Sequence, residues 1–221
     1  MKRKLLLTSK GLPEELSGAF LYFLGKSPKK CSVSFITTAA YADGENPEWL
    51  DYYVKQLRGY GIENIEELDL KNKTQKELSS ALNDKDIIFV NGGNTFYLLY
   101  WIRKSGFGRM IYNLLDEGKV YIGVSAGSYV ACPTIEAATW KHSDRNKIGL
   151  KDLTGLNLVP FLVSTHFEEQ YRSVIEKASR SVKYPIVALN DTQAVLVEDS
   201  RYKVVGAGRK EFFNGFAENL T

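Results

Sequence analysis

The chain has 221 residues, of which 44% are hydrophobic and 25% charged, and these proportions exclude disordered, collagen-like and coiled-coil proteins. The formal net charge is only +3, and the basic residues are spread along the sequence, which argues against a nucleic-acid-binding protein. Two cysteines, Cys31 and Cys132, are too few for a disulfide framework in a chain of this size. The apolar run at 5–7 is too short for a signal peptide, and no run approaches the length of a membrane helix. We therefore expect one cytoplasmic domain, 1–221, with no membrane partner and no nucleic-acid partner.

Short apolar runs alternate with segments of helical period up to residue 124, a pattern typical of parallel α/β proteins. We expect the elements in this order: strand 4–8, helix 14–24, strand 32–37, helix 47–57, strand 65–70, helix 74–82, strand 86–90, helices 95–102 and 108–115, and strand 119–124. Another helix should follow the last of these strands.

The second half of the sequence has a different pattern. An apolar extended segment at 158–165 precedes a helix at 168–182, and three short strands at 185–189, 194–197 and 202–205 follow closely. Their spacing predicts an antiparallel ribbon at one edge of the sheet. The expected fold is therefore an open, mostly parallel sheet with helices on both faces, whose ligands bind at the carboxyl ends of the strands.

A serine lies in a tight, glycine-flanked turn directly after the strand 119–124. The segment from Gly123 to Gly127 reads Gly-Val-Ser-Ala-Gly, with Ser125 at its centre. This pattern is typical of a nucleophile elbow, in which small neighbours let a serine hydroxyl project from the end of a buried strand. A plain glycine-rich turn with no catalytic role is the alternative.

A second glycine-rich turn follows the strand 86–90 and precedes a helix. It reads Asn-Gly-Gly-Asn-Thr at 91–95, so the N–H groups of Gly92 and Gly93 can point at an anion. Beside a serine nucleophile that anion would be the tetrahedral oxyanion. A bound phosphate is the alternative, although the turn lacks the Lys-Ser/Thr pair of a P-loop. Asn94 or Thr95 can also act simply as the cap of the helix.

Histidines and carboxylates supply candidates for the base and the acid. His166 follows the extended segment 158–165, whereas His142 lies in a polar run that predicts a surface loop. We expect His166 to act as the base for Ser125, and Asp191, at the end of the next strand, to orient it. Rival acids are Asp144, Glu168 and Glu169. Two histidines and two distant cysteines lack the spacing of a zinc site, so we expect no metal and no cofactor.

Four segments taken together resemble the peptidase E family of serine peptidases, which includes aspartyl dipeptidases and cyanophycinases. They are 91–96 (Asn-Gly-Gly-Asn-Thr-Phe), 123–128 (Gly-Val-Ser-Ala-Gly-Ser), 131–135 (Ala-Cys-Pro-Thr-Ile) and 165–167 (Thr-His-Phe). The similarity runs over nearly the whole chain. It implies a fold like that of class I glutamine amidotransferases, in which a serine takes the place of the cysteine nucleophile.

The resemblance also implies roles for individual residues. It assigns the nucleophile to Ser125, the base to His166, and the oxyanion hole to the backbone N–H groups of Ala126, Gly92 and Gly93.

The acid of the family follows the histidine and is often a glutamate in a Pro-Glu-Gly-Asn context. The matching stretch here, 189–192, reads Leu-Asn-Asp-Thr and retains Asp191 as the candidate. A second acid proposed for the family, about fifteen residues after the serine, falls at Trp140 in this chain.

One departure from the family concerns the substrate. Aspartyl dipeptidases are thought to hold the substrate's Asp side chain with an arginine early in the helix after the histidine. Here Glu168 stands at the nearest matching place and Arg172 comes one turn later. Because a carboxylate would repel Asp and could hold an amine, the preference for an N-terminal Asp is not expected to carry over.

The sequence thus predicts a serine peptidase of short peptides, present as a monomer or homodimer. Asn94, Glu168 and Arg172 are the candidate substrate-binding residues. An esterase or amidase with the same Ser-His-acid residues is one alternative. A catalytically silent protein that binds an anion at Gly92 and Gly93 is another.

Overall fold

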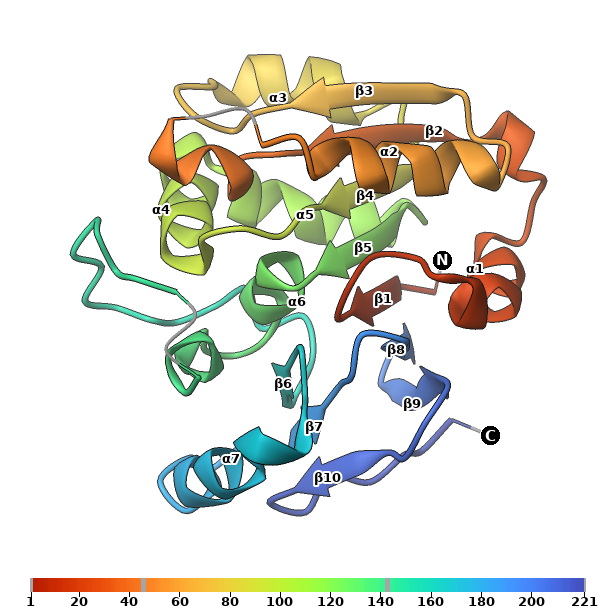
Figure 1. The fold of residues 1–221 in the computed structure, drawn as a ribbon. Coiled ribbons are helices and arrows are strands. Elements are labelled where there is room, and N and C mark those ends of the chain that lie inside the picture. Colours follow the sequence, from red (N-terminus) through yellow and green to blue (C-terminus); the bar gives the residue numbers. More distant parts are fainter. Residues whose placement is uncertain (1, 45–46, 142–143, 221) are drawn as a thin grey trace.

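A seven-stranded sheet forms the centre of the computed structural model, which describes residues 2–44, 47–141 and 144–220. The strand order is β3-β2-β4-β5-β1-β8-β9. Strands β1 to β5 run parallel, while β8 and β9 are antiparallel at one edge (Figure 1). The bounds are β1 Lys4–Thr8, β2 Ser32–Ile36, β3 Asn64–Leu68, β4 Ile87–Val90, β5 Val120–Val124, β8 Gln193–Glu198 and β9 Arg201–Gly206. The carboxyl ends of β4 and β5 therefore lie side by side.

Helices cover both faces of this sheet, as expected for central strands that are buried at nearly every position. Successive residues of β1 point to opposite faces, so Leu5 and Leu7 join one buried core and Leu6 joins the other. The core around Leu6 packs under α1 (Ser17–Leu24) and α2 (Leu50–Gly59). The other core packs under α3 (Gln75–Leu82), α4 (Thr95–Ser105), α5 (Phe107–Asp116) and α6 (Ala126–Ala131).

A second, three-stranded sheet lies below the large one in Figure 1. Its order is β10-β7-β6, with bounds β6 Leu162–Ser164, β7 Ile186–Ala188 and β10 Glu211–Phe213. Strand β7 runs parallel to β6 and antiparallel to β10. The helix α7 (Arg172–Ser179) connects β6 to β7 and follows a 3-10 turn at Glu169–Tyr171.

The α/β class and the mostly parallel sheet expected from the sequence are confirmed, and so is the antiparallel ribbon formed by β8 and β9. The segment 185–189 behaves differently from the expectation, because β7 pairs on both sides within the small sheet and does not join that ribbon. All three residues of β7 are buried, and a short apolar run of this kind carries no local signal for which sheet it joins.

The remaining short elements are 3-10 turns at Glu14–Leu16, Pro28–Lys30, Ala40–Asp43 and Glu136–Thr139. Among the described residues, no helix has the length and apolar character needed to cross a membrane.

Candidate active site

Ser125 occupies a strained turn between β5 and α6. It is the single residue between Val124 and Ala126, with φ 48° and ψ −103°, and this left-handed conformation is uncommon outside glycine. Its backbone N–H donates to the carbonyl of Thr8 at 3.1 Å. A Cβ atom at Gly127 would lie 2.1 Å from the carbonyl oxygen of Val90, so the first turn of α6 can approach β4 only with glycine there. This is the geometry of a nucleophile elbow.

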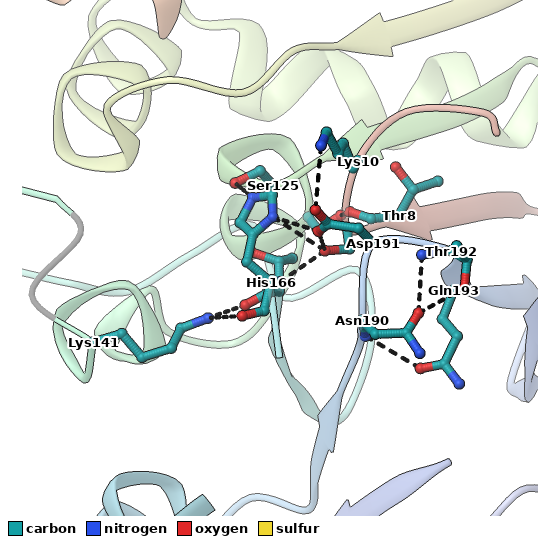
Figure 2. Close-up of polar contacts among 12 residues, drawn as sticks. Thr8, Lys10, Ser125, Lys141, His166, Asn190, Asp191, Thr192 and Gln193 are labelled. Carbon is teal, nitrogen blue, oxygen red and sulfur yellow. Dashed lines mark hydrogen bonds and ion pairs between the residues drawn. The ribbon is translucent and has the colours of Figure 1, made fainter. Parts of the chain in front are cut away.

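His166 and Asp191 form a hydrogen-bonded chain with Ser125 (Figure 2). The Ser125 Oγ lies 3.1 Å from His166 Nε2, and His166 Nδ1 lies 2.6 Å from Asp191 Oδ1. The hydrogen bond with His166 lowers the pKa of Asp191 to about 2, and bonding to Ser9 and the charge of Lys10 act in the same direction. A carboxylate with such a pKa is ionised throughout the neutral range. The three residues therefore have the relative placement of a nucleophile, a base and an orienting acid.

Two residues near His166 were not singled out from the sequence. The Ser9 hydroxyl lies 2.9 Å from Asp191 Oδ1 and accepts the backbone N–H of His166 at 2.7 Å. The Lys141 ammonium donates to the carbonyl oxygens of Thr165 and His166. Ser9 directly follows the predicted strand 4–8, so its place at a strand end was a usable signal. Lys141 had no such signal because it lies in an irregular segment far from His166 in the sequence.

The glycine-rich turn after β4 lies against Ser125. A Cβ atom at Gly92 would be 3.4 Å from Ser125 Cβ. In the described part of the chain, the backbone N–H groups of Gly92, Gly93 and Ala126 meet no protein acceptor, although those of Asn91 and Asn94 do.

Gly93 is fixed by close packing. It has φ 124°, and a Cβ atom there would lie 2.3 Å from the carbonyl oxygen of Ala39. Both features require glycine. The turn therefore keeps its shape while the N–H groups of Gly92 and Gly93 stay without a protein acceptor in the described chain.

The rival acids have other contacts. Asp144 accepts the backbone N–H of Thr95 at 2.9 Å at the start of α4, and burial raises its pKa. The carboxylate of Glu169 pairs with Arg172. Of these carboxylates, Asp191 is the one in contact with the imidazole of His166.

Two of the candidate substrate-binding residues, Arg172 and Asn94, already have partners within the protein. Arg172 pairs with Glu169 and with Glu211, at 2.5 and 2.9 Å, so its charge is already compensated. The side chain of Asn94 caps α4 by accepting the N–H of Tyr97 and also donates to the carbonyl of Arg145.

Glu168 lies on the surface of the molecule. It is exposed, accepts a hydrogen bond from Gln170, and its charge acts on the Lys141 ammonium. His142, expected in a surface loop, falls outside the described residues. Within those residues no group of His, Cys, Asp and Glu side chains could hold a metal ion.

Comparison with known proteins identifies the family. The model for peptidase family S51 matches residues 5–205. The chain belongs to peptidase family S51. The resemblance to peptidase E is thereby confirmed, and this S51 member is a serine peptidase.

Individual relatives agree with the S51 assignment. An uncharacterized peptidase of Pasteurella multocida is 32% identical, with 86% of this chain and 92% of the relative covered. Peptidase E of a Nostoc species is 28% identical, covering 83% of this chain and 75% of the relative. A crystal structure of a candidate peptidase E protein from Listeria monocytogenes superposes with a TM-score of 0.80 at 25% identity, covering 94% of this chain and all of that one.

Proposed function

We propose that this S51 peptidase hydrolyses peptide bonds in short peptides, with Ser125 as the nucleophile, His166 as the base and Asp191 as the orienting acid. The observation that carries the proposal is the unbroken contact chain of 3.1 and 2.6 Å from Ser125 through His166 to Asp191. A serine hydroxyl is a weak nucleophile by itself and needs an adjacent base that a third group orients.

The chemistry follows from this arrangement. Nε2 of His166 takes the proton of Ser125 Oγ as the oxygen attacks the substrate carbonyl, and the imidazolium then returns a proton to the leaving amine. Asp191 accepts the Nδ1–H of His166, which fixes the tautomer with a free Nε2 and stabilises the imidazolium. A water molecule, deprotonated by the same nitrogen, then attacks the acyl carbonyl, and the imidazolium returns that proton to Ser125 Oγ as the acid product leaves.

The oxyanion of the tetrahedral intermediate would be held by the N–H groups of Ala126, Gly92 and Gly93. Their lack of protein acceptors in the described chain and the contact of Gly92 with Ser125 support this role. Each such donor contributes about 3 kcal/mol to the stabilisation of the transition state.

A small cavity borders the glycine-rich turn at Asn94. A cavity of about 200 Å³ lies next to Asn94 and is lined also by Ala42, Tyr97, Lys147 and Ile148. That volume is smaller than the pockets that take drug-sized ligands, and none of Ser125, His166 and Asp191 lines the cavity.

The test is Ser125→Ala with a fluorophosphonate label and a peptide library. The label should react with the unmodified enzyme and not with the variant, and turnover should fall about 10⁴- to 10⁶-fold while Tm barely changes. A variant that retains a tenth of the activity would contradict the nucleophile. Cleavage of esters but of no peptide in the library would contradict the substrate class.

A further inference from the structure

The hydroxyl of Ser9 bonds to two members of the proposed proton-transfer chain at the same time. It donates to Asp191 Oδ1 at 2.9 Å and accepts the backbone N–H of His166 at 2.7 Å. It also lies 3.5 Å from His166 Nδ1. Ser9 is fully buried, so no exchange with solvent competes for these bonds. One small side chain thus contacts both the acid and the base.

A buried serine with a purely structural role usually bonds to nearby carbonyl groups of the backbone. Ser128 is an example in the same region, since its hydroxyl lies 2.8 Å from the carbonyls of Thr8 and of Gly123. Ser9 instead donates to the carboxylate that orients the imidazole. Its contacts are therefore with functional groups and not with the local main chain.

The position of Ser9 in the fold gives these contacts their consequence. Ser9 follows β1, which pairs with β5 in the large sheet, and the carbonyl of its neighbour Thr8 accepts the N–H of Ser125. His166 follows β6 of the small sheet, and Asp191 lies in the connection from β7 to β8. The dipeptide Thr8-Ser9 therefore touches the nucleophile with one group and the base and acid with another.

We propose that Ser9 is a positioning residue, which fastens His166 and Asp191 to the strand beside Ser125 and so fixes the alignment of the nucleophile with its base. The inference rests on the proposed roles of Ser125, His166 and Asp191. The bond to the N–H of His166 also holds that residue at its left-handed φ of 53°, a conformation that costs free energy in a non-glycine residue. The bond to Asp191 Oδ1 aims that oxygen at Nδ1.

The experiment compares Ser9→Ala and Ser9→Cys with Ser34→Ala, which removes another buried hydroxyl, in β2 of the large sheet, but one without a hydrogen-bond partner. Hydrogen bonds to charged groups are strong enough that Ser9→Ala should lower kcat about tenfold to 100-fold. We expect KM to stay within about threefold, because the Ser9 hydroxyl is fully buried and already bonded to Asp191 and to the N–H of His166. Ser34→Ala should leave kcat unchanged.

Ser9→Cys retains a side chain of similar size but donates only weakly, so it should also lose about tenfold in kcat even if Ser9→Ala fails to fold. The proton NMR resonance of His166 Nδ1–H supplies a readout that a structural role would not move, and it should shift or broaden in both variants of Ser9. Full kcat in a folded variant of Ser9, or an unchanged resonance, would overturn the inference. If Ser125→Ala is inactive while Ser9→Ala is not, this inference alone fails; if Ser125→Ala is active, the proposed function fails first.

Discussion

Ser125 and His166 both have left-handed backbone conformations, with φ of 48° and 53°, yet they are held in different ways. Ser125 is fixed by main-chain packing, since α6 starts directly after it and Gly127 abuts the backbone of β4. His166 is fixed by side chains from distant segments, because Ser9 binds its N–H and Lys141 binds its carbonyl. The position of the proposed nucleophile should therefore change only when the backbone is disturbed, whereas the position of the proposed base should respond to single polar substitutions and to pH.

Asp191→Asn tests whether His166 depends on single side chains, and it has the largest expected effect. The amide would leave the imidazole in the wrong tautomer, so turnover should fall by up to about 10⁴-fold while Tm changes little. Steady-state kinetics and a thermal melt measure the two. The matched control is Asp144→Asn, which alters a carboxylate bonded to Thr95 and not to His166. A larger loss of turnover in the control would move the acid role to Asp144.

Gly127→Ala tests whether main-chain packing holds Ser125 in place. The new Cβ would lie 2.1 Å from the carbonyl oxygen of Val90, so the turn must open, and we expect the free energy of unfolding to fall by about 3 kcal/mol or more. Urea denaturation measures this change. Gly59→Ala, at the end of α2, is the control because nothing lies within 4 Å of a Cβ atom there, and it should leave stability unchanged or raise it by up to about 1 kcal/mol, since alanine favours a helix more than glycine does. Equal effects of the two substitutions would argue against close packing as the support of Ser125.

Lys141 should make the position of His166 sensitive to pH, because its ammonium group binds the carbonyl of His166. Burial lowers the pKa of Lys141 to about 8, although the charges of Asp191, Glu168 and Asp144 oppose the shift. In the unfolded chain the Lys141 ammonium keeps its proton up to about pH 10.4. Between about pH 8 and pH 10.4 the unfolded state therefore binds more protons than the folded state, and the free energy of unfolding should rise with pH. The cost of the buried charge is fully present below pH 8.

The measurement is the free energy of unfolding of the unmodified protein and of Lys141→Met between pH 7.5 and 10. Above pH 8, the free energy of unfolding of the unmodified protein should rise relative to that of the variant by about 1 kcal/mol per pH unit. A constant difference would contradict the lowered pKa. At pH 7.5 the variant should also lose activity, since the carbonyls of Thr165 and His166 lose their donor.

Substrate preference should show the smallest effect. Glu168 is exposed beside Lys141, and Arg172 is already paired with Glu169 and Glu211. A like charge near the substrate disfavours Asp, so kcat/KM for Ala-Leu and Lys-Leu should exceed that for Asp-Leu by about tenfold, equivalent to about 1.4 kcal/mol. Glu168→Arg should reduce this difference in kcat/KM. The control Glu176→Arg, at an exposed position of α7, should leave it unchanged. A tenfold preference of the unmodified enzyme for Asp-Leu would make Arg172 the suspected Asp-binding residue.

The sequence predicts the large sheet and the placement of Ser125, Gly92 and Gly93 at its carboxyl edge, because each follows a buried strand and parallel strands bring such ends together. It also places His166 and Asp191 at strand ends, and the structure brings both to Ser125. These predictions need only local patterns and one rule about open sheets.

The contacts of Ser9 and Lys141 depend on more than local pattern. Ser9 reaches Asp191 because β8 lies next to β1 in the large sheet, a pairing between the two ends of the chain. Lys141 reaches His166 across 25 residues that contain only short elements of structure. The small sheet escaped prediction for a similar reason, since its strands have three residues each and no period.

The separation between Ser9 and Asp191, 182 residues along the chain, has a consequence for the synthesis of the enzyme. Contacts of such long range form late, after most of the chain has been brought together. A growing polypeptide that has passed Ser125 but has not reached residue 191 carries the proposed nucleophile without its oriented base. Hydrolytic activity through the proposed catalytic residues would thus arise only when nearly the whole chain has been made and folded.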